Sequence, residues 1–137
     1  LNKRIGSSNF ITVEDLFSGK GLSDLYKVVA EGKIKSGEDI SKAHIEKTDQ
    51  HATQTLELFS EMLGLMTREL IVQYLPFGGI YFAGSVSRAV FNAKLTSKFE
   101  KSFKEDTHYL KDLEKFQINL ITDDAAGLLG CGVLSEA

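Results

Sequence analysis

The sequence lacks most of the features that would place it in a special class of protein. Its single cysteine, Cys131, excludes a framework of internal disulfides and fits a reducing compartment. No apolar stretch reaches the ~20 residues that span a bilayer, and the opening Leu1-Asn2-Lys3-Arg4 does not have the form of a secretory signal. We therefore predict a cytoplasmic protein with no membrane partner.

A cluster of charge of one sign is missing as well. The net charge is −3, and acidic and basic residues are interspersed, whereas a protein that binds nucleic-acid backbones has a clustered basic face. The lysine-rich residues 94–115 are balanced by acidic residues, which indicates a solvated surface. Nucleic acid is therefore not an expected partner.

Metal-ligand spacing and a self-contained catalytic set are also absent. His44, His51 and His108 are scattered over polar stretches, with no HExxH pattern. Asp123 and Asp124 could act as acids or as metal ligands, but an acidic pair before a helix more often caps that helix. We predict no metal site formed by this chain alone.

The composition that remains is that of an ordinary globular domain. Of the 137 residues, 42% are hydrophobic and 26% are charged, which is enough to bury a core. We predict a single domain over residues 1–137. Because the first residue is not methionine, we also expect a processed chain or a piece of a longer one.

Capping patterns predict short helices in the first third of the chain. Residues 12–15 form a capping box, and the short helix that it opens should end at residues 18–21, with Gly19 as a left-handed C-terminal cap. A second helix is predicted from about Gly21 to Gly32, because apolar residues recur along one side of it. Residues 36–39 repeat the capping pattern and predict a third helix.

The longest helical pattern begins at Asp49, a predicted N-cap, and ends near Leu75. Pro76, the only proline, cannot continue it. A second row of apolar residues widens the apolar sector, so we expect this helix to be buried on more than one side. The first row is Ala52, Leu56, Phe59, Leu63, Met66 and Leu70, and the second is Leu58, Met62, Leu65 and Val72.

A short apolar run bracketed by glycines follows this helix. Residues 80–83 predict a strand buried on both faces. Gly84 allows a bend, or the close approach of a ligand, and Ser85 could cap the next helix. Most turns of this kind are structural, and the stretch alone does not establish a nucleotide site.

The last part of the chain predicts an α/β fold with few strands. Residues 86–104 indicate one or two amphipathic helices, residues 109–116 a further helical turn, and residues 117–122 a strand with one solvated face. Residues 125–135 predict a helix of small and apolar residues that contacts the sheet or leaves room for a ligand, with Cys131 in the core. Two strands make a poor sheet, so we expect further strands from residues 1–11 or from another part of the polypeptide.

Four segments, in order, resemble bacterial glucokinases. Residues 14–26, EDLFSGKGLSDLY, are similar to the family's E-x-V-L-S-G-P-G-L-x-x-L-Y, and residues 78–84, GGIYFAG, to its G-G-V-Y-I-A-G-G. Residues 99–121 resemble F-x-x-K-G-R-F-x-x-Y-x-x-x-I-P-V-Y-L-I, and residues 126–132, AGLLGCG, resemble the closing P-G-L-L-G-x-G. Together they cover nearly the whole chain from about Ile5.

The resemblance implies the C-terminal part of the large lobe of a two-lobed hexose kinase. The implied fold is α/β and belongs to the ribonuclease-H-like, actin-like superfamily, here helix-rich with a small mixed sheet. The implied reaction converts glucose and ATP, with Mg²⁺, to glucose 6-phosphate and ADP in a homodimer. Ser18, Gly19 and Gly21 before one helix, and Ala83, Gly84 and Ser85 before another, would then lie beside the adenosine.

Three departures and one absence qualify this expectation. Ser85 replaces the second glycine of A-G-G and adds a side chain where the nucleotide would approach, and Lys20 replaces the proline of S-G-P-G. Residues 124–126, Asp-Ala-Ala, stand where the family has a residue pair ending in proline. The family's D-x-G-G-T phosphate loop, its catalytic Asn-Asp pair and its sugar-binding E-x-x-H do not occur here, so we predict a fragment that does not phosphorylate sugar. The alternative is a non-catalytic, kinase-like domain that senses sugar or nucleotide.

Overall fold

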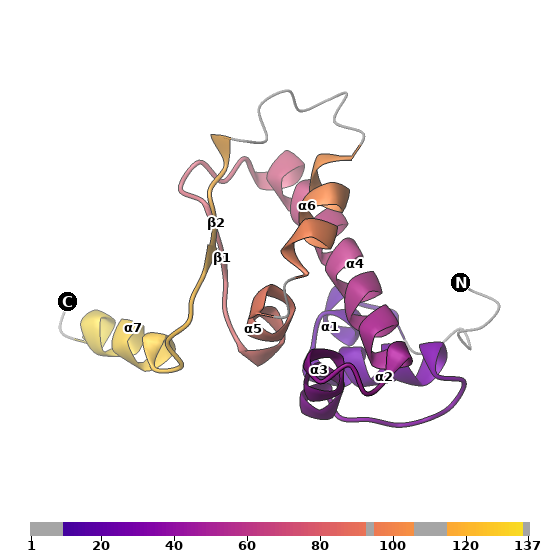
Figure 1. The fold of residues 1–137 in the computed structure, drawn as a ribbon. Coiled ribbons are helices and arrows are strands. Elements are labelled where there is room, and N and C mark those ends of the chain that lie inside the picture. The colour runs from indigo at the N-terminus through magenta and orange to yellow at the C-terminus, as the bar shows by residue number, and fades with distance from the viewer. Residues whose placement is uncertain (1–9, 93–94, 106–114, 136–137) are drawn as a thin grey trace.

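A computed structural model describes residues 10–92, 95–105 and 115–135. The elements, in chain order, are α1 (Val13–Leu16), α2 (Gly19–Val29), α3 (Gly37–Ile45), α4 (Gln50–Tyr74), β1 (Ile80–Phe82), α5 (Ser85–Asn92), α6 (Thr96–Lys104), β2 (Ile118–Leu120) and α7 (Ala126–Ser135). Helix α4 crosses the molecule, α1 to α3 surround its N-terminal half, and α6 lies along its C-terminal half (Figure 1). The predictions for residues 1–9 and for most of 109–116 lie outside the described residues.

Three predicted helix starts are confirmed by their caps. Thr12 Oγ1 accepts a hydrogen bond from Asp15 N at 3.2 Å, and Thr12 N donates to Asp15 Oδ2 at 2.8 Å, which closes the capping box of α1. The side chain of Ser36 caps α3 by accepting from Asp39 N, and that of Asp49 caps α4 by accepting from His51 N and Ala52 N. These side chains satisfy N–H groups that have no partner within their helices.

The predicted role of Gly19 as a left-handed C-terminal cap is wrong. Ser18 is the N-cap of α2, its Oγ accepting from Gly21 N at 3.0 Å, and Gly19 is the first residue of that helix. Helix α1 ends at Leu16, with Phe17 as its C-cap. The Ser-Gly pair therefore starts a helix, because a serine oxygen that caps the next turn favours helical backbone after it. Gly32, with φ +99°, follows the end of α2 as predicted.

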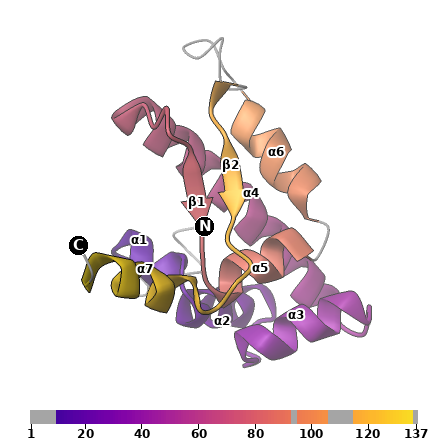
Figure 2. The same cartoon turned by 90° about the vertical axis from the view of Figure 1, so that its left-hand side faces the viewer.

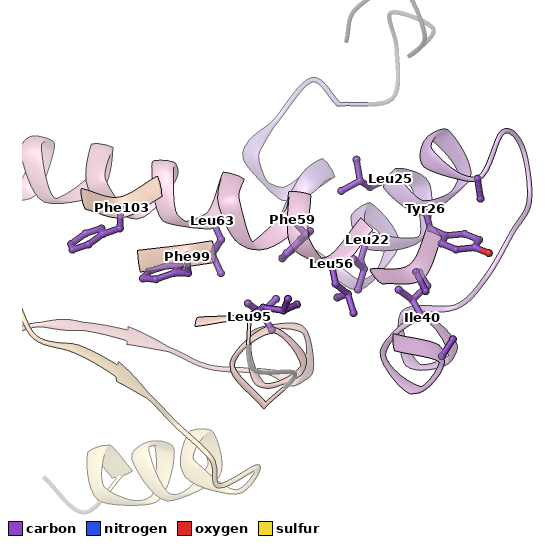
Figure 3. Packing of buried hydrophobic residues seen from close by; sticks show 14 of the residues in the cluster. Leu22, Leu25, Tyr26, Ile40, Leu56, Phe59, Leu63, Leu95, Phe99 and Phe103 are labelled. Carbon is purple, nitrogen blue, oxygen red and sulfur yellow. The ribbon is translucent and has the colours of Figure 1, made fainter. Parts of the chain in front are cut away.

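One face of α4 forms the centre of the core, as Figure 3 shows. Leu56 and Phe59 pack with residues of α2 and α3, whereas Leu63 packs with Phe99 and Phe103 of α6. The expectation of burial on more than one side holds only in part for the second apolar row, because Leu58 and Met62 are partly buried against the core whereas Leu65 is 40% exposed and Val72 is 50% exposed. The described residues leave α4 partly uncovered at Leu65 and Val72.

The two strands pair in parallel, with Ile80 opposite Ile118 and Phe82 opposite Leu120. The mixed sheet that we predicted is therefore a parallel pair within the described residues. Burial on both faces is also wrong, because Tyr81 is 60% exposed. Phe82 lies on the covered face, where its ring is 6.0 Å from that of Phe99. The helices pack on one face of the pair only, so successive residues of β1 alternate in exposure.

Neither the predicted solvated face of β2 nor the predicted packing of α7 is found. All three residues of β2 are partly buried. Helix α7 has no buried residue and lies apart from the helical core (Figure 1). Cys131, predicted in the core, is exposed. Its neighbours Leu128 and Leu134 are 78% and 79% exposed, because nothing in the described chain packs against this helix.

Within the three described ranges, no helix is both long and apolar enough to cross a membrane.

Candidate functional site

Two turns that are far apart in the sequence meet at the N-termini of α2 and α5. A Cβ atom placed on Gly19, the first residue of α2, would lie 3.9 Å from Val86 Cγ2 in α5. Helix α3 begins close to α2, since a Cβ on Gly37 would lie 3.6 Å from Leu22 Cδ2. The starts of these helices gather at one end of the molecule (Figure 2).

A cavity of about 680 Å³ lies between these helix starts. Leu22 of α2 and Val86 and Ala89 of α5 give it apolar walls. Its polar lining comes from serine hydroxyls and from Lys20, Glu38 and Arg88. A pocket of this size, with apolar walls and a few polar groups, suits a small organic ligand that carries charge or hydroxyls at one end.

The serine hydroxyls around the cavity are partly committed to their own helices. Ser23 Oγ donates to Gly19 O at 3.2 Å, and Ser41 Oγ donates to Gly37 O at 2.9 Å. Each of these oxygens can still accept a hydrogen bond. A ligand in the cavity would therefore meet acceptors at these positions and N–H donors at the helix starts.

The two cations that line the cavity are each paired with a carboxylate outside its lining. Lys20 pairs with Asp24, four residues on, and this bond raises the pKa of the Lys20 ammonium. Arg88 pairs with Asp124 in the turn before α7. The two cations differ in environment, because the side chain of Lys20 is 83% exposed and that of Arg88 only 20%.

The bend after β1 is set by Gly84, whose φ is +94°. This left-handed conformation favours glycine, and no atom lies within 4 Å of the position where a Cβ would be. Gly84 O accepts from Arg88 N at 3.2 Å, so Gly84 precedes α5 and Ser85 is its first residue. Ser85 was predicted as the cap, and that prediction is one residue late.

The structure distributes the site residues expected from the resemblance over several places. Gly19 and Ser85 line the large cavity, whereas Ala83, Gly84 and Ser85 line a hollow of about 230 Å³ beside the aromatic rings of Phe17 and Phe59. Ser18 caps α2. Gly21 is buried against α1, where a Cβ would lie 2.2 Å from Leu16 O, so its lack of a side chain is required by packing.

Sequence reasoning missed Ser36, Glu38 and Arg88 as lining residues. Ser36 and Glu38 were assigned only to the start of a helix, and Arg88 to an amphipathic surface. One signal could have found them, since the helices that meet here all begin with a serine at or next to the cap. Such starts leave several N–H groups free, and they favour a shared polar site once folding brings them together.

Magnesium is a poor fit to this part of the chain. No group of three His, Cys, Asp or Glu side chains placed to hold a metal occurs among the residues that the structure describes. Asp123 Oδ1 accepts from Ala125 N at 2.8 Å at the turn before α7, as expected for a capping acid. Asp124 forms a salt bridge with Arg88.

Comparison with known proteins gives a consistent result. The family model described as Glucokinase matches residues 1–137. A glucokinase from Brucella abortus is 27% identical over 131 residues, which is 92% of this chain and 38% of the relative. One from Photorhabdus laumondii is 28% identical over 127 residues, covering 89% of this chain and 40% of the relative.

The backbone agrees with the sequence. The crystal structure of a glucokinase from an Antarctic psychrotroph superposes with a TM-score of 0.73 at 25% identity, covering 92% of this chain and 41% of that one. The chain thus spans about two fifths of the length of these relatives. With a family match along its whole length, the chain belongs to the glucokinase family.

Proposed function

We propose that this chain forms the nucleotide side of an ATP-dependent hexose kinase that converts glucose and ATP to glucose 6-phosphate and ADP. The observation that carries the proposal is the cavity where the starts of α2 and α5 meet. One residue from each of the two groups expected beside the adenosine, Gly19 and Ser85, lines this cavity, although the two are far apart in the chain.

The chemistry of the cavity suits an adenosine group. Its volume of about 680 Å³ lies within the range of about 300–1,000 Å³ for small-molecule sites. A flat base would lie against Leu22, Val86 and Ala89, and the ribose hydroxyls and phosphates would face helix starts that carry free N–H groups. Bound ATP would supply the phosphoryl group for transfer.

The remaining parts of the reaction are assigned to residues outside this chain. Phosphoryl transfer needs a carboxylate to accept the hydroxyl proton, a phosphate cradle and Mg²⁺. The described residues place no metal-binding cluster at the cavity, and the chain is shorter than its relatives. We infer that Mg²⁺, the sugar and most phosphate contacts belong to the rest of a longer polypeptide, which acts in the cytoplasm as a homodimer.

The nucleotide part of this proposal is tested by filling the cavity. We expect ATP and ADP to bind the wild-type protein, measured by isothermal titration calorimetry, and Ala89→Phe to abolish binding because Ala89 lines the cavity. Ala126→Phe in α7, away from the cavity, is the matched control and should bind normally. Circular dichroism checks that both variants fold, and equal binding by both would exclude this cavity as the site.

The catalytic part is tested with a panel of hexoses. The polypeptide as its gene encodes it should phosphorylate glucose, whereas residues 1–137 alone should not, because the groups for transfer are assigned elsewhere. Turnover of glucose and ATP by residues 1–137 would contradict this assignment.

One feature favours the alternative of a sensing domain without catalysis. Lys20 and Ser85 both line the cavity, where the family pattern has a proline and a glycine, so a longer charged side chain and a hydroxyl stand at these two positions. Such substitutions can leave ligand binding intact and still shift the position of the ligand. Phosphoryl transfer is sensitive to that position. Nucleotide binding without turnover by the encoded polypeptide would support this alternative.

A further inference from the structure

Arg88 has the most sheltered charge in the lining of the cavity. Its side chain is 20% exposed, whereas that of its partner Asp124 is 85% exposed. Arg88 lies on α5, one turn from the bend at Gly84, and Asp124 lies in the turn between β2 and α7. The ion pair therefore joins a group that lines the cavity to one that solvent can reach freely.

We propose that Arg88 binds the phosphate groups of the nucleotide in this cavity, and that Asp124 competes with those phosphates for the guanidinium. This inference rests on the proposed function and adds a named contact to it. Arg88 thereby makes the cavity prefer a nucleotide over the uncharged nucleoside, and Asp124 limits that preference.

The geometry supports each part of this assignment. A guanidinium presents five N–H donors in a planar fork, and it matches phosphate oxygens two at a time. One of these nitrogens, Nη2, is bonded to Asp124, which leaves donors for a ligand. Because Asp124 is so exposed, it can return to water without burying a charge, so the exchange of one anion for the other costs little.

Lys20 provides the comparison within the same cavity. It carries the same charge as Arg88 and also lines the cavity, but its side chain is 83% exposed. Water and salt screen such a charge strongly. If the cavity attracts phosphate only through its general field, removing either cation should have a similar effect, whereas a direct contact makes Arg88 the more important.

The experiment measures the affinities of ATP and of adenosine separately, by calorimetry, for the wild type and for Arg88→Gln, Lys20→Gln and Lys27→Gln. Lys27 lies on α2 and is exposed, so its variant is a control for net charge alone. We expect Arg88→Gln to lower the affinity for ATP about tenfold, the scale of lost charge-assisted hydrogen bonds. The affinity for adenosine should not change. Lys20→Gln should weaken ATP about twofold at most, and Lys27→Gln should have no effect.

Two further variants complete the test. Asp124→Asn keeps the shape of the turn and removes the competing charge. It should therefore raise the affinity for ATP about threefold without changing the affinity for adenosine. Arg88→Lys keeps the charge and loses the fork, so it should recover only part of the affinity for ATP. Circular dichroism confirms that each variant is folded.

Three results would overturn the inference. Equal affinities of wild type and Arg88→Gln for ATP would exclude the contact, and equal weakening of ATP and adenosine would mean that Arg88 shapes the cavity. Equal losses in Lys20→Gln and Arg88→Gln would assign the effect to the general field. Failure of the proposed function looks different, because then neither ATP nor adenosine binds the wild type.

Discussion

Tyr26 Oη donates a hydrogen bond to Asp49 Oδ2 across 2.7 Å and so ties α2 to the first turn of α4. The same carboxylate oxygen accepts from Lys35 Nζ, and Oδ1 accepts from His51 N at 2.9 Å as the cap of α4. The bonds from Lys35 and Tyr26, in that order, hold the pKa of Asp49 well below its ordinary value. One side chain thus starts the longest helix and joins it to two preceding segments.

This arrangement predicts that stability falls in acid. Because the pKa of Asp49 is lower in the folded chain than in the unfolded one, its contribution is present above about pH 4, the ordinary carboxyl range. It is lost as the pH falls through the lowered folded value. Asp49→Ala should lower the free energy of unfolding at pH 7 by about 1 kcal/mol or more from the lost cap alone, and it should flatten the dependence between pH 5 and pH 2.

Urea unfolding followed by circular dichroism at several pH values measures both effects. Tyr26→Phe is the matched variant, because it removes one hydrogen bond to Asp49 and keeps the charge and the cap. It should cost about 1 kcal/mol at pH 7. Identical acid profiles for Asp49→Ala and the wild type would show that this carboxylate is not responsible.

The close approach of α4 and α6 predicts an unusual response at Gly64. Inside a helix, glycine normally lowers the free energy of unfolding by roughly 0.5–1 kcal/mol relative to alanine. A Cβ at Gly64, however, would lie 2.4 Å from the carbonyl oxygen of Phe99 in α6. We expect Gly64→Ala to lower the free energy of unfolding by about 1–3 kcal/mol, as other overpacked sites do.

Gly130 of α7 supplies the control, since no atom lies within 4 Å of a Cβ placed there. Gly130→Ala should raise helix content and should not lower the free energy of unfolding. Chemical denaturation of the two variants side by side gives the comparison. A stable Gly64→Ala variant would mean that α6 can move away from α4.

Most helix starts of this fold could be predicted from sequence, with the starts of α2 and α5 as exceptions, whereas the burial of several surfaces could not. Caps such as Thr12 and Asp49 act within one turn, so the residues that form them also identify them. Burial of an apolar residue needs a partner that the local sequence does not name. Tyr81 and Cys131 were predicted inside for their apolar surroundings, and both are exposed because no described element covers them.

The candidate site, too, could be predicted from sequence only in part. Resemblance to the family pointed to the turns that hold Gly19 and Ser85, but it gave no sign that Arg88 would line the same cavity as these two residues. The orientation of Arg88 depends on where α5 packs against α2, and on the turn that presents Asp124. Both are tertiary facts, which no local pattern encodes.

The exposure of Cys131 predicts fast chemical modification. As the only cysteine of the chain, it allows α7 to be followed without other labels. We expect Cys131 to react with a thiol reagent in the folded protein at nearly the rate in urea, because it lies on an exposed face. Slow reaction at every protein concentration would mean that α7 packs on this same chain, and protection that grows with concentration would indicate that a second copy covers it.

The backbone conformation of Gly84 predicts that substitution of this residue weakens nucleotide binding. No atom would contact a Cβ there, so steric crowding cannot decide the outcome. The φ of +94° does decide it, because a left-handed conformation costs other residues about 1–2 kcal/mol. Gly84→Ala should therefore destabilise the turn, move Ser85 and the start of α5, and lower the affinity of the cavity for ATP.

Gly78→Ala is the matched control, because Gly78 is equally open but has no positive φ. Calorimetric titration of both variants should show weaker binding for Gly84→Ala only, and equal affinities would mean that the bend does not position the cavity.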